Sequence, residues 1–172
     1  MKKFSMFIKR FLSSPRRVGS VTSSGRQLSE EIANQAIMLS GAKSLIELGP
    51  GSGAITNFLP LNTISIEVDE GFVELLKKKY PDRSIVNTDA TDFLLNLKNP
   101  VNIVSSIPLI GNPHADQIIN AVKVAYHSGM IEKLITYSYG RKSPYSRCKF
   151  KSEIRTKFVF FNIPPANIWV YS

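Results

Sequence analysis

The chain has 172 residues, of which 43% are hydrophobic and 20% charged, and its formal net charge is +9. This length and composition fit one domain with a single sizeable core, and no apolar run approaches the roughly 18 residues that would span a bilayer. The single cysteine, Cys148, excludes an internal disulfide and gives no metal cluster, so we expect a reducing compartment and no bound metal.

The positive charge is concentrated at two places in the chain. Residues 1–29 contain seven Lys or Arg and no acid, and residues 141–157 contain seven and one acid. Residues 30–140 carry a net charge of −4. Basic flanks on a mildly acidic body favour a polyanionic partner, either nucleic acid or an anionic membrane surface. The alternative is that the basic ends only aid solubility.

The first predicted element is a basic amphipathic helix over residues 1–12. Its apolar positions recur at i, i+3, i+4, i+7 and i+8, and we expect membrane contact through Phe4, Phe7, Ile8, Lys9, Arg10 and Phe11. Each basic side chain near an anionic surface contributes about 1 kcal/mol. Residues 1–29 are therefore predicted to bind the membrane surface and residues 30–172 to form the core, within one domain. The alternative is a helix packed on its own domain.

Strands and helices alternate through the rest of the chain. Strands are predicted at Ala42–Leu48, Thr63–Val68, Ser84–Asn87, Val101–Ile107 and Lys133–Tyr139, and helices from about Ala54 and at Gly71–Tyr80, Ala90–Leu97 and Ala115–Tyr126. This alternation predicts a doubly wound, mostly parallel α/β sheet of the Rossmann-like kind. Two further β-rich runs, Thr156–Ile163 and Asn167–Ser172, lie too close for a crossover helix and predict a C-terminal antiparallel hairpin.

A glycine-rich turn follows the first predicted strand, and acids follow that strand and its two successors. Gly49, Gly51 and Gly53 alternate directly after Glu47, while Glu67 and Asp89 come at the ends of the next two strands. In doubly wound sheets ligands bind at the carboxyl ends of the strands. Glu47 would repel a pyrophosphate but attract a cationic amino acid, Glu67 suits ribose hydroxyls, and Asp89 suits an adenine amino group. The alternative is that Glu67 and Asp89 are ordinary caps or surface acids.

The run from Glu47 to Gly53 resembles motif I of the class I S-adenosylmethionine-dependent methyltransferases, with Glu67 and Asp89 at the matching later positions. The resemblance implies S-adenosylmethionine as the cofactor, bound by the residues named above together with Ala90 and Ser105. The fourth predicted strand ends in Ser105-Ser-Ile-Pro-Leu109. Enzymes that methylate adenine amino groups carry Asn or Asp, then Pro, then an aromatic residue in this region. Here Ser106 and Leu109 replace the polar and aromatic members, which counts against RNA adenine dimethylation.

Several segments are similar to the bacterial phospholipid N-methyltransferases, which methylate phosphatidylethanolamine toward phosphatidylcholine. They are Arg17–Ser24, Ile46–Gly53, Ser105–Leu109, Thr136–Pro144 and Asn162–Tyr171, with Thr22 where the family has proline. The resemblance implies an enzyme that is peripheral on the inner face of the membrane, with phosphatidylethanolamine as substrate and no nucleic-acid partner. The rival enzyme is an rRNA adenine N6-methyltransferase, for which an RNA-binding extension would be expected. A third possibility is a membrane-tethered protein that binds the cofactor without catalysis.

The candidate residues for methyl transfer lie after the fourth and fifth predicted strands. Ser105 and Ser106 would position the substrate, and the faces of Tyr137 and Tyr139 would hold a methylated cation. Arg141 and Lys142 would bind the lipid phosphate. Catalysis would rest on positioning and removal of water, and no side chain stands out as a general base.

Overall fold

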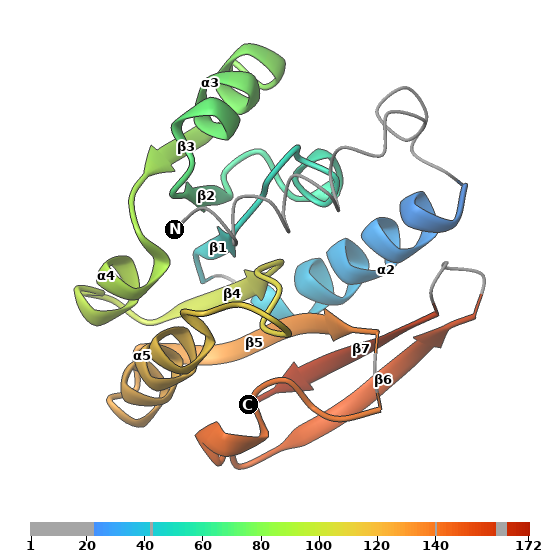
Figure 1. Cartoon of the computed structure of the whole chain (residues 1–172), viewed down its shortest axis with the longest axis vertical. Helices are drawn as coiled ribbons and strands as arrows, with labels where there is room; N and C mark the ends of the chain where they lie inside the picture. The colour runs from blue at the N-terminus through green and yellow to red at the C-terminus, as the bar shows by residue number, and fades with distance from the viewer. Residues whose placement is uncertain (1–22, 42, 140, 161–164) are drawn as a thin grey trace.

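The computed structural model describes residues 23–41, 43–139, 141–160 and 165–172. Seven strands form one sheet in the order β3-β2-β1-β4-β5-β7-β6 (Figure 1). The strands are β1 Leu45–Leu48, β2 Ile64–Glu67, β3 Ser84–Asn87, β4 Val101–Ser105, β5 Ile131–Ser138, β6 Glu153–Val159 and β7 Ala166–Tyr171. The first five strands pair in parallel, and β7 lies antiparallel between β5 and β6. The predicted doubly wound sheet with a C-terminal antiparallel hairpin is confirmed.

Helices cover both faces of this sheet (Figure 1). They are α2 Ser23–Ser40, α3 Glu70–Lys79, α4 Ala90–Leu95 and α5 Ala115–His127, with short 3-10 turns η1 Thr56–Phe58 and η2 Ser146–Cys148. One apolar cluster joins α4 and α5 to the sheet through Leu94, Ile119, Val122, Ile46, Leu48 and Ile103. A second cluster joins α2 to the opposite face through Leu28, Ile32, Ala36, Leu45, Val104 and Ile135. No helix in the described part of the chain has the length and apolarity needed to cross a bilayer.

Two helical features differ from the prediction. The helix expected from about Ala54 is only the single turn η1, because Pro60 cannot continue a helix and Leu59 before it is extended at ψ 157°. Helix α2, which covers one face of the sheet, was not predicted. The amphipathic helix predicted over residues 1–12 lies outside the described residues, so the single domain over 1–172 stays a prediction.

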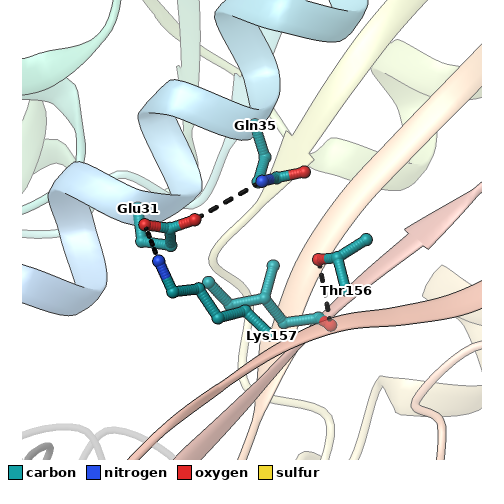
Figure 2. A network of polar contacts seen from close by, with 5 residues as sticks. Glu31, Gln35, Thr156 and Lys157 are labelled. Carbon is teal, nitrogen blue, oxygen red and sulfur yellow. Dashed lines mark hydrogen bonds and ion pairs between the residues drawn. The ribbon is translucent and has the colours of Figure 1, made fainter.

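An ion pair joins the C-terminal hairpin to helix α2. Strand β6 begins at Glu153, three residues earlier than predicted, and a register irregularity lies between Arg155 and Lys157. Figure 2 shows that the Lys157 ammonium reaches Glu31 of α2, where Nζ donates to Oε2 at 2.6 Å. Lys157 therefore faces α2, and its charge is neutralised by an acid far away in the sequence.

Candidate active site at the carboxyl ends of the strands

The turn after β1 depends on glycine for two different physical reasons. Gly49, Gly51 and Gly53 all have positive φ, at 69°, 55° and 83°. A Cβ at Gly49 would lie 2.7 Å from Ile107 Cγ1, and one at Gly53 would lie 2.7 Å from the Tyr80 ring. A Cβ at Gly51 would meet nothing within 4 Å among the described residues. The turn is therefore packed tightly behind its first and last glycines and leaves room in front of the middle one.

Glu67, at the end of β2, faces this turn and accepts hydrogen bonds from three backbone amides. The Gly51 N–H donates to Oε2 at 3.0 Å, and the N–H groups of Val68 and Asp69 donate to Oε1 at 3.0 Å each. The side chain is buried, with 7% of its surface exposed. Each carboxylate oxygen can accept more than one bond, so the arrangement fixes the acid while leaving acceptor capacity. Its role in binding ribose stays a prediction.

The Glu47 carboxylate is buried in the protein interior, against η1 and β2. The residue is fully buried, and its carboxylate accepts bonds from Thr56 Oγ1 at 2.8 and 3.0 Å and from Ser65 Oγ at 2.7 Å. Burial raises the pKa of this carboxyl above its ordinary value, although both hydroxyls act in the opposite direction. The observed contacts join β1, β2 and η1. Direct contact of Glu47 with a cationic amino acid remains a prediction.

Asp89 is the N-cap of α4, directly after β3. Its Oδ1 accepts from the Thr91 N–H at 2.7 Å and more weakly from the Asp92 N–H at 3.4 Å. Ala90 follows as the first, half-buried residue of the helix. The cap holds the carboxylate at the exposed end of β3, on the same sheet edge as the glycine turn. Contact between this pair and an adenine base stays a prediction.

The two serines at the end of β4 have different surroundings. Ser105 is fully buried, and its Oγ lies 3.0 Å from the Tyr145 hydroxyl, while its carbonyl accepts from Thr136 Oγ1 at 2.8 Å. The Ser106 N–H donates to the Leu48 carbonyl, which holds the residue beside the start of the glycine turn. The Ser106 Oγ is itself buried and has no hydrogen-bond partner among the described residues. A buried hydroxyl without a partner is costly, and in a native structure it calls for a partner such as water, an ion or a ligand.

The tyrosines predicted on β5 contact each other. The rings of Tyr137 and Tyr139 meet edge to face, with centroids 5.6 Å apart. Burial raises the pKa of the Tyr137 hydroxyl well above its ordinary range, so this group stays neutral. The register that pairs Ser105 with Thr136, continued by one residue, puts Tyr137 alongside Ser106. Whether either ring contacts substrate stays a prediction.

The remaining predicted site residues lie away from the turn. Arg141 and Lys142 are exposed in the loop after β5, and Arg141 lines a hollow near the start of β7. Phe4, Phe7, Ile8, Lys9, Arg10 and Phe11 fall outside the described residues, so their membrane role and the location at the inner membrane face stay predictions.

Sequence reasoning missed the residues that support the site from a distance. Tyr145 bonds Ser105 across 40 positions, Thr56 and Ser65 hold Glu47, and Ile107 packs on Gly49. Burial raises the pKa of Tyr145 to about 12, which keeps its hydroxyl protonated beside Ser105. Apart from Ile107, which lies in the Ser105–Leu109 segment, no motif marks these residues. The apolar strand patterns of β1, β2 and β4 only show that something must pack against them.

Comparisons with known proteins identify the fold. The chain is 29% identical over 121 residues to the ribosomal RNA small subunit methyltransferase A of Hydrogenobaculum sp. (strain Y04AAS1), covering 66% of this chain and 47% of that protein. The chain thus spans about half the length of this relative. Among solved structures, the N-methyltransferase NodS from Bradyrhizobium japonicum WM9 superposes with a TM-score of 0.72 at 13% identity, covering 87% of this chain and 96% of NodS. The 23S rRNA methyltransferase ErmE gives 0.56 at 22% identity, covering 84% and 66%. No protein-family model matches the chain.

These findings confirm the class I methyltransferase fold and, with it, S-adenosylmethionine as the predicted cofactor. They do not support the resemblance to phospholipid N-methyltransferases. The predicted absence of a nucleic-acid partner and the predicted phospholipid substrate are wrong, because the curated relative is an rRNA methyltransferase. The physical reason for the error is that basic flanks attract RNA phosphates and lipid phosphates alike, so charge alone could not decide between them.

Proposed function

We propose that this chain is a methyltransferase domain that transfers a methyl group from S-adenosylmethionine to the exocyclic amino group of an adenine in RNA. The observation that carries the proposal is the buried Oγ of Ser106 at the end of β4, which has no hydrogen-bond partner within the part of the chain that the structure describes. An amino group donates hydrogen bonds, so this acceptor suits it. The rRNA methyltransferase relative supports the choice of RNA.

The arrangement of the glycine turn and of the acids at the next two strand ends suits S-adenosylmethionine. The space in front of Gly51 admits a ligand against bare backbone, and Glu67 and Asp89 present carboxylates at the ends of the next two strands. Glu67 would accept from the ribose hydroxyls and Asp89 from the adenine amino group of the cofactor. When bound, the cofactor supplies an electrophilic methyl group on a sulfonium.

The protein's contribution to methyl transfer is orientation and exclusion of water. Ser106 as a whole is half-buried, so rotation about its Cα–Cβ bond turns the hydroxyl toward an approaching base. By accepting one N–H of the amino group, the hydroxyl aims the nitrogen lone pair away from itself. A single hydroxyl grips less firmly than the planar carboxamide of Asn. Leu109 offers no stacking face, so Tyr137 and Tyr139 are the aromatic residues available beside the target base.

The test is a methyl-transfer assay with labelled S-adenosylmethionine and three samples: unmethylated small-subunit rRNA, phosphatidylethanolamine vesicles, and buffer. We expect label in RNA, recovered as N6-methylated adenosine after digestion to nucleosides. Label in lipid, or in neither substrate, would refute the proposal.

A variant pair tests the role of Ser106. Ser106→Ala should lower kcat on RNA about tenfold and leave cofactor affinity unchanged, because it removes one hydrogen bond to the reacting group. Ser106→Asn, which restores a planar acceptor, should recover activity. Ser146→Ala removes an exposed hydroxyl from η2 and serves as the control. Equal rates for Ser106→Ala and the control would show that the hydroxyl does not contact the substrate.

A further inference from the structure

We infer that a hollow lined by Arg141, Arg155, Phe158 and Asn167 binds a nucleotide of single-stranded RNA that flanks the target base. The inference rests on the proposed function for its choice of RNA, and it adds a second place of contact away from the methyl-transfer site. The hollow has a volume of about 440 Å³. That size lies within the range of small-ligand sites and is suited to one nucleotide.

The strand register places this hollow on the sheet edge that carries the candidate active site. Asn167 at the start of β7 pairs with Ser138, the last residue of β5, and on its other side with Phe158 of β6. Strand β5 in turn neighbours β4, which ends at Ser105. Adjacent strands lie about 4.8 Å apart, so β6 lies roughly 14 Å from β4 across the sheet. One short single strand of RNA can reach both places.

The two arginines of the hollow are available for a phosphate. Neither Arg141 nor Arg155 forms an ion pair or side-chain hydrogen bond with the residues that the structure describes. Other bases of the same segment are already neutralised: Lys157 pairs with Glu31 (Figure 2) and Arg147 with Asp116. Guanidinium groups bind phosphate oxygens in a bidentate manner, which makes an arginine pair a suitable phosphodiester site.

Phe158 supplies a face for a base beside that phosphate site. Its side chain is 52% exposed, although it is apolar and lies in a strand. Stacking on an aromatic ring next to a basic groove is the common way in which proteins hold single-stranded nucleic acid. The segment 141–157 carries six more positive than negative charges, and four once the ion pairs of Lys157 and Arg147 with acids outside the segment are counted, so the surroundings of the hollow attract a polyanion. The exposed phenyl ring, together with two arginines that form no ion pair with any described residue, thus fits one nucleotide better than a purely apolar partner.

Binding without catalysis tests the inference. The full chain is titrated into a fluorescently labelled, single-stranded, adenine-containing RNA of about 12 nucleotides, and the anisotropy gives Kd at several salt concentrations. Arg141→Gln/Arg155→Gln should weaken binding at least about tenfold and reduce the dependence of log Kd on log salt by about 0.7, the value for one phosphate on a single strand. Phe158→Leu keeps an apolar side chain, removes the stacking face, and should weaken binding about tenfold with the salt dependence unchanged.

The matched control is Lys77→Gln/Lys78→Gln, which removes the same charge from the exposed end of α3. It should change Kd less than about twofold, and thermal melts confirm that every variant is folded. Equal weakening by both double variants, or absence of RNA binding by the wild-type chain, would overturn the inference. So would an Arg141→Gln/Arg155→Gln variant that loses binding to phosphatidylglycerol vesicles but keeps its affinity for RNA. If the hollow binds RNA but no methyl group is transferred to it, the inference holds and the proposed function fails.

Discussion

Replacing Gly49 by alanine is the sharpest test of how the turn and the end of β4 fit together. The added Cβ would lie 2.7 Å from Ile107 Cγ1, closer than carbon atoms approach without displacement. Forced overpacking of this kind costs about 1–3 kcal/mol. Holding a non-glycine residue at φ 69° adds about 1–2 kcal/mol. We therefore expect the free energy of unfolding to fall by about 3 kcal/mol, which a domain of ordinary stability survives.

Gly51→Ala separates the two contributions. Gly51 also has positive φ, at 55°, but a Cβ there meets no described atom within 4 Å. Its replacement should cost only the backbone contribution of about 1–2 kcal/mol. Its effect on function should nevertheless be larger than its effect on stability, because the new methyl group occupies the space predicted for the cofactor.

A double-mutant cycle measures the contact directly. Ile107→Ala removes the Cγ1 atom that the new methyl group would strike, so it should recover about 1–2 kcal/mol of the loss in Gly49→Ala and nothing in Gly51→Ala. Unfolding in urea is followed by far-ultraviolet circular dichroism and by fluorescence of the single tryptophan, Trp169, which is buried in β7. Additive effects of Gly49→Ala and Ile107→Ala, within about 0.5 kcal/mol, would refute the reasoning.

Three further predictions concern the acids and the buried tyrosine. Glu67→Gln removes the negative charge that accepts hydrogen bonds from three backbone amides. Calorimetry should show that this variant binds S-adenosylmethionine at least about tenfold more weakly than wild type. An unchanged affinity would contradict the assignment of Glu67 to the ribose. Burial raises the pKa of Glu47 above its ordinary 4.5, so the stability that this group contributes is present below pH 4.5 and is lost as pH rises through the folded-state pKa. The urea midpoint of Glu47→Gln should therefore gain on that of wild type as pH rises above 4.5, and parallel curves would contradict this. Folding raises the pKa of Tyr145 from 10.0 to about 12, so between these pH values the tyrosine ionises in the unfolded chain but not in the folded one. Over this range the free energy of unfolding of wild type should fall by up to roughly 3 kcal/mol relative to Tyr145→Phe. Identical alkaline unfolding profiles would exclude this linkage.

The sequence by itself determined the class of fold and the strand ends where the site lies. Alternating strands and helices, a glycine turn after the first strand and a hairpin without room for a crossover are local patterns, and each has one dominant structural solution. The same local logic failed at Ala54, where Pro60 limits the expected helix to the turn η1. It also left the substrate undecided, because arginine and lysine side chains bind the phosphates of RNA and of lipids alike.

Only the tertiary structure decided which side chains meet at those strand ends. The sequence predicts that Glu47 faces the ligand. In the structure η1 and β2 pack around it, and its carboxylate accepts hydrogen bonds from Thr56 and Ser65. The pairing of β6 with β7 determines that Arg155 and Phe158 share a hollow with Arg141, while Lys157 faces α2. The physical reason is that strand register and helix packing act over tens of residues, whereas the periodicities that reveal strands and helices extend over only a few.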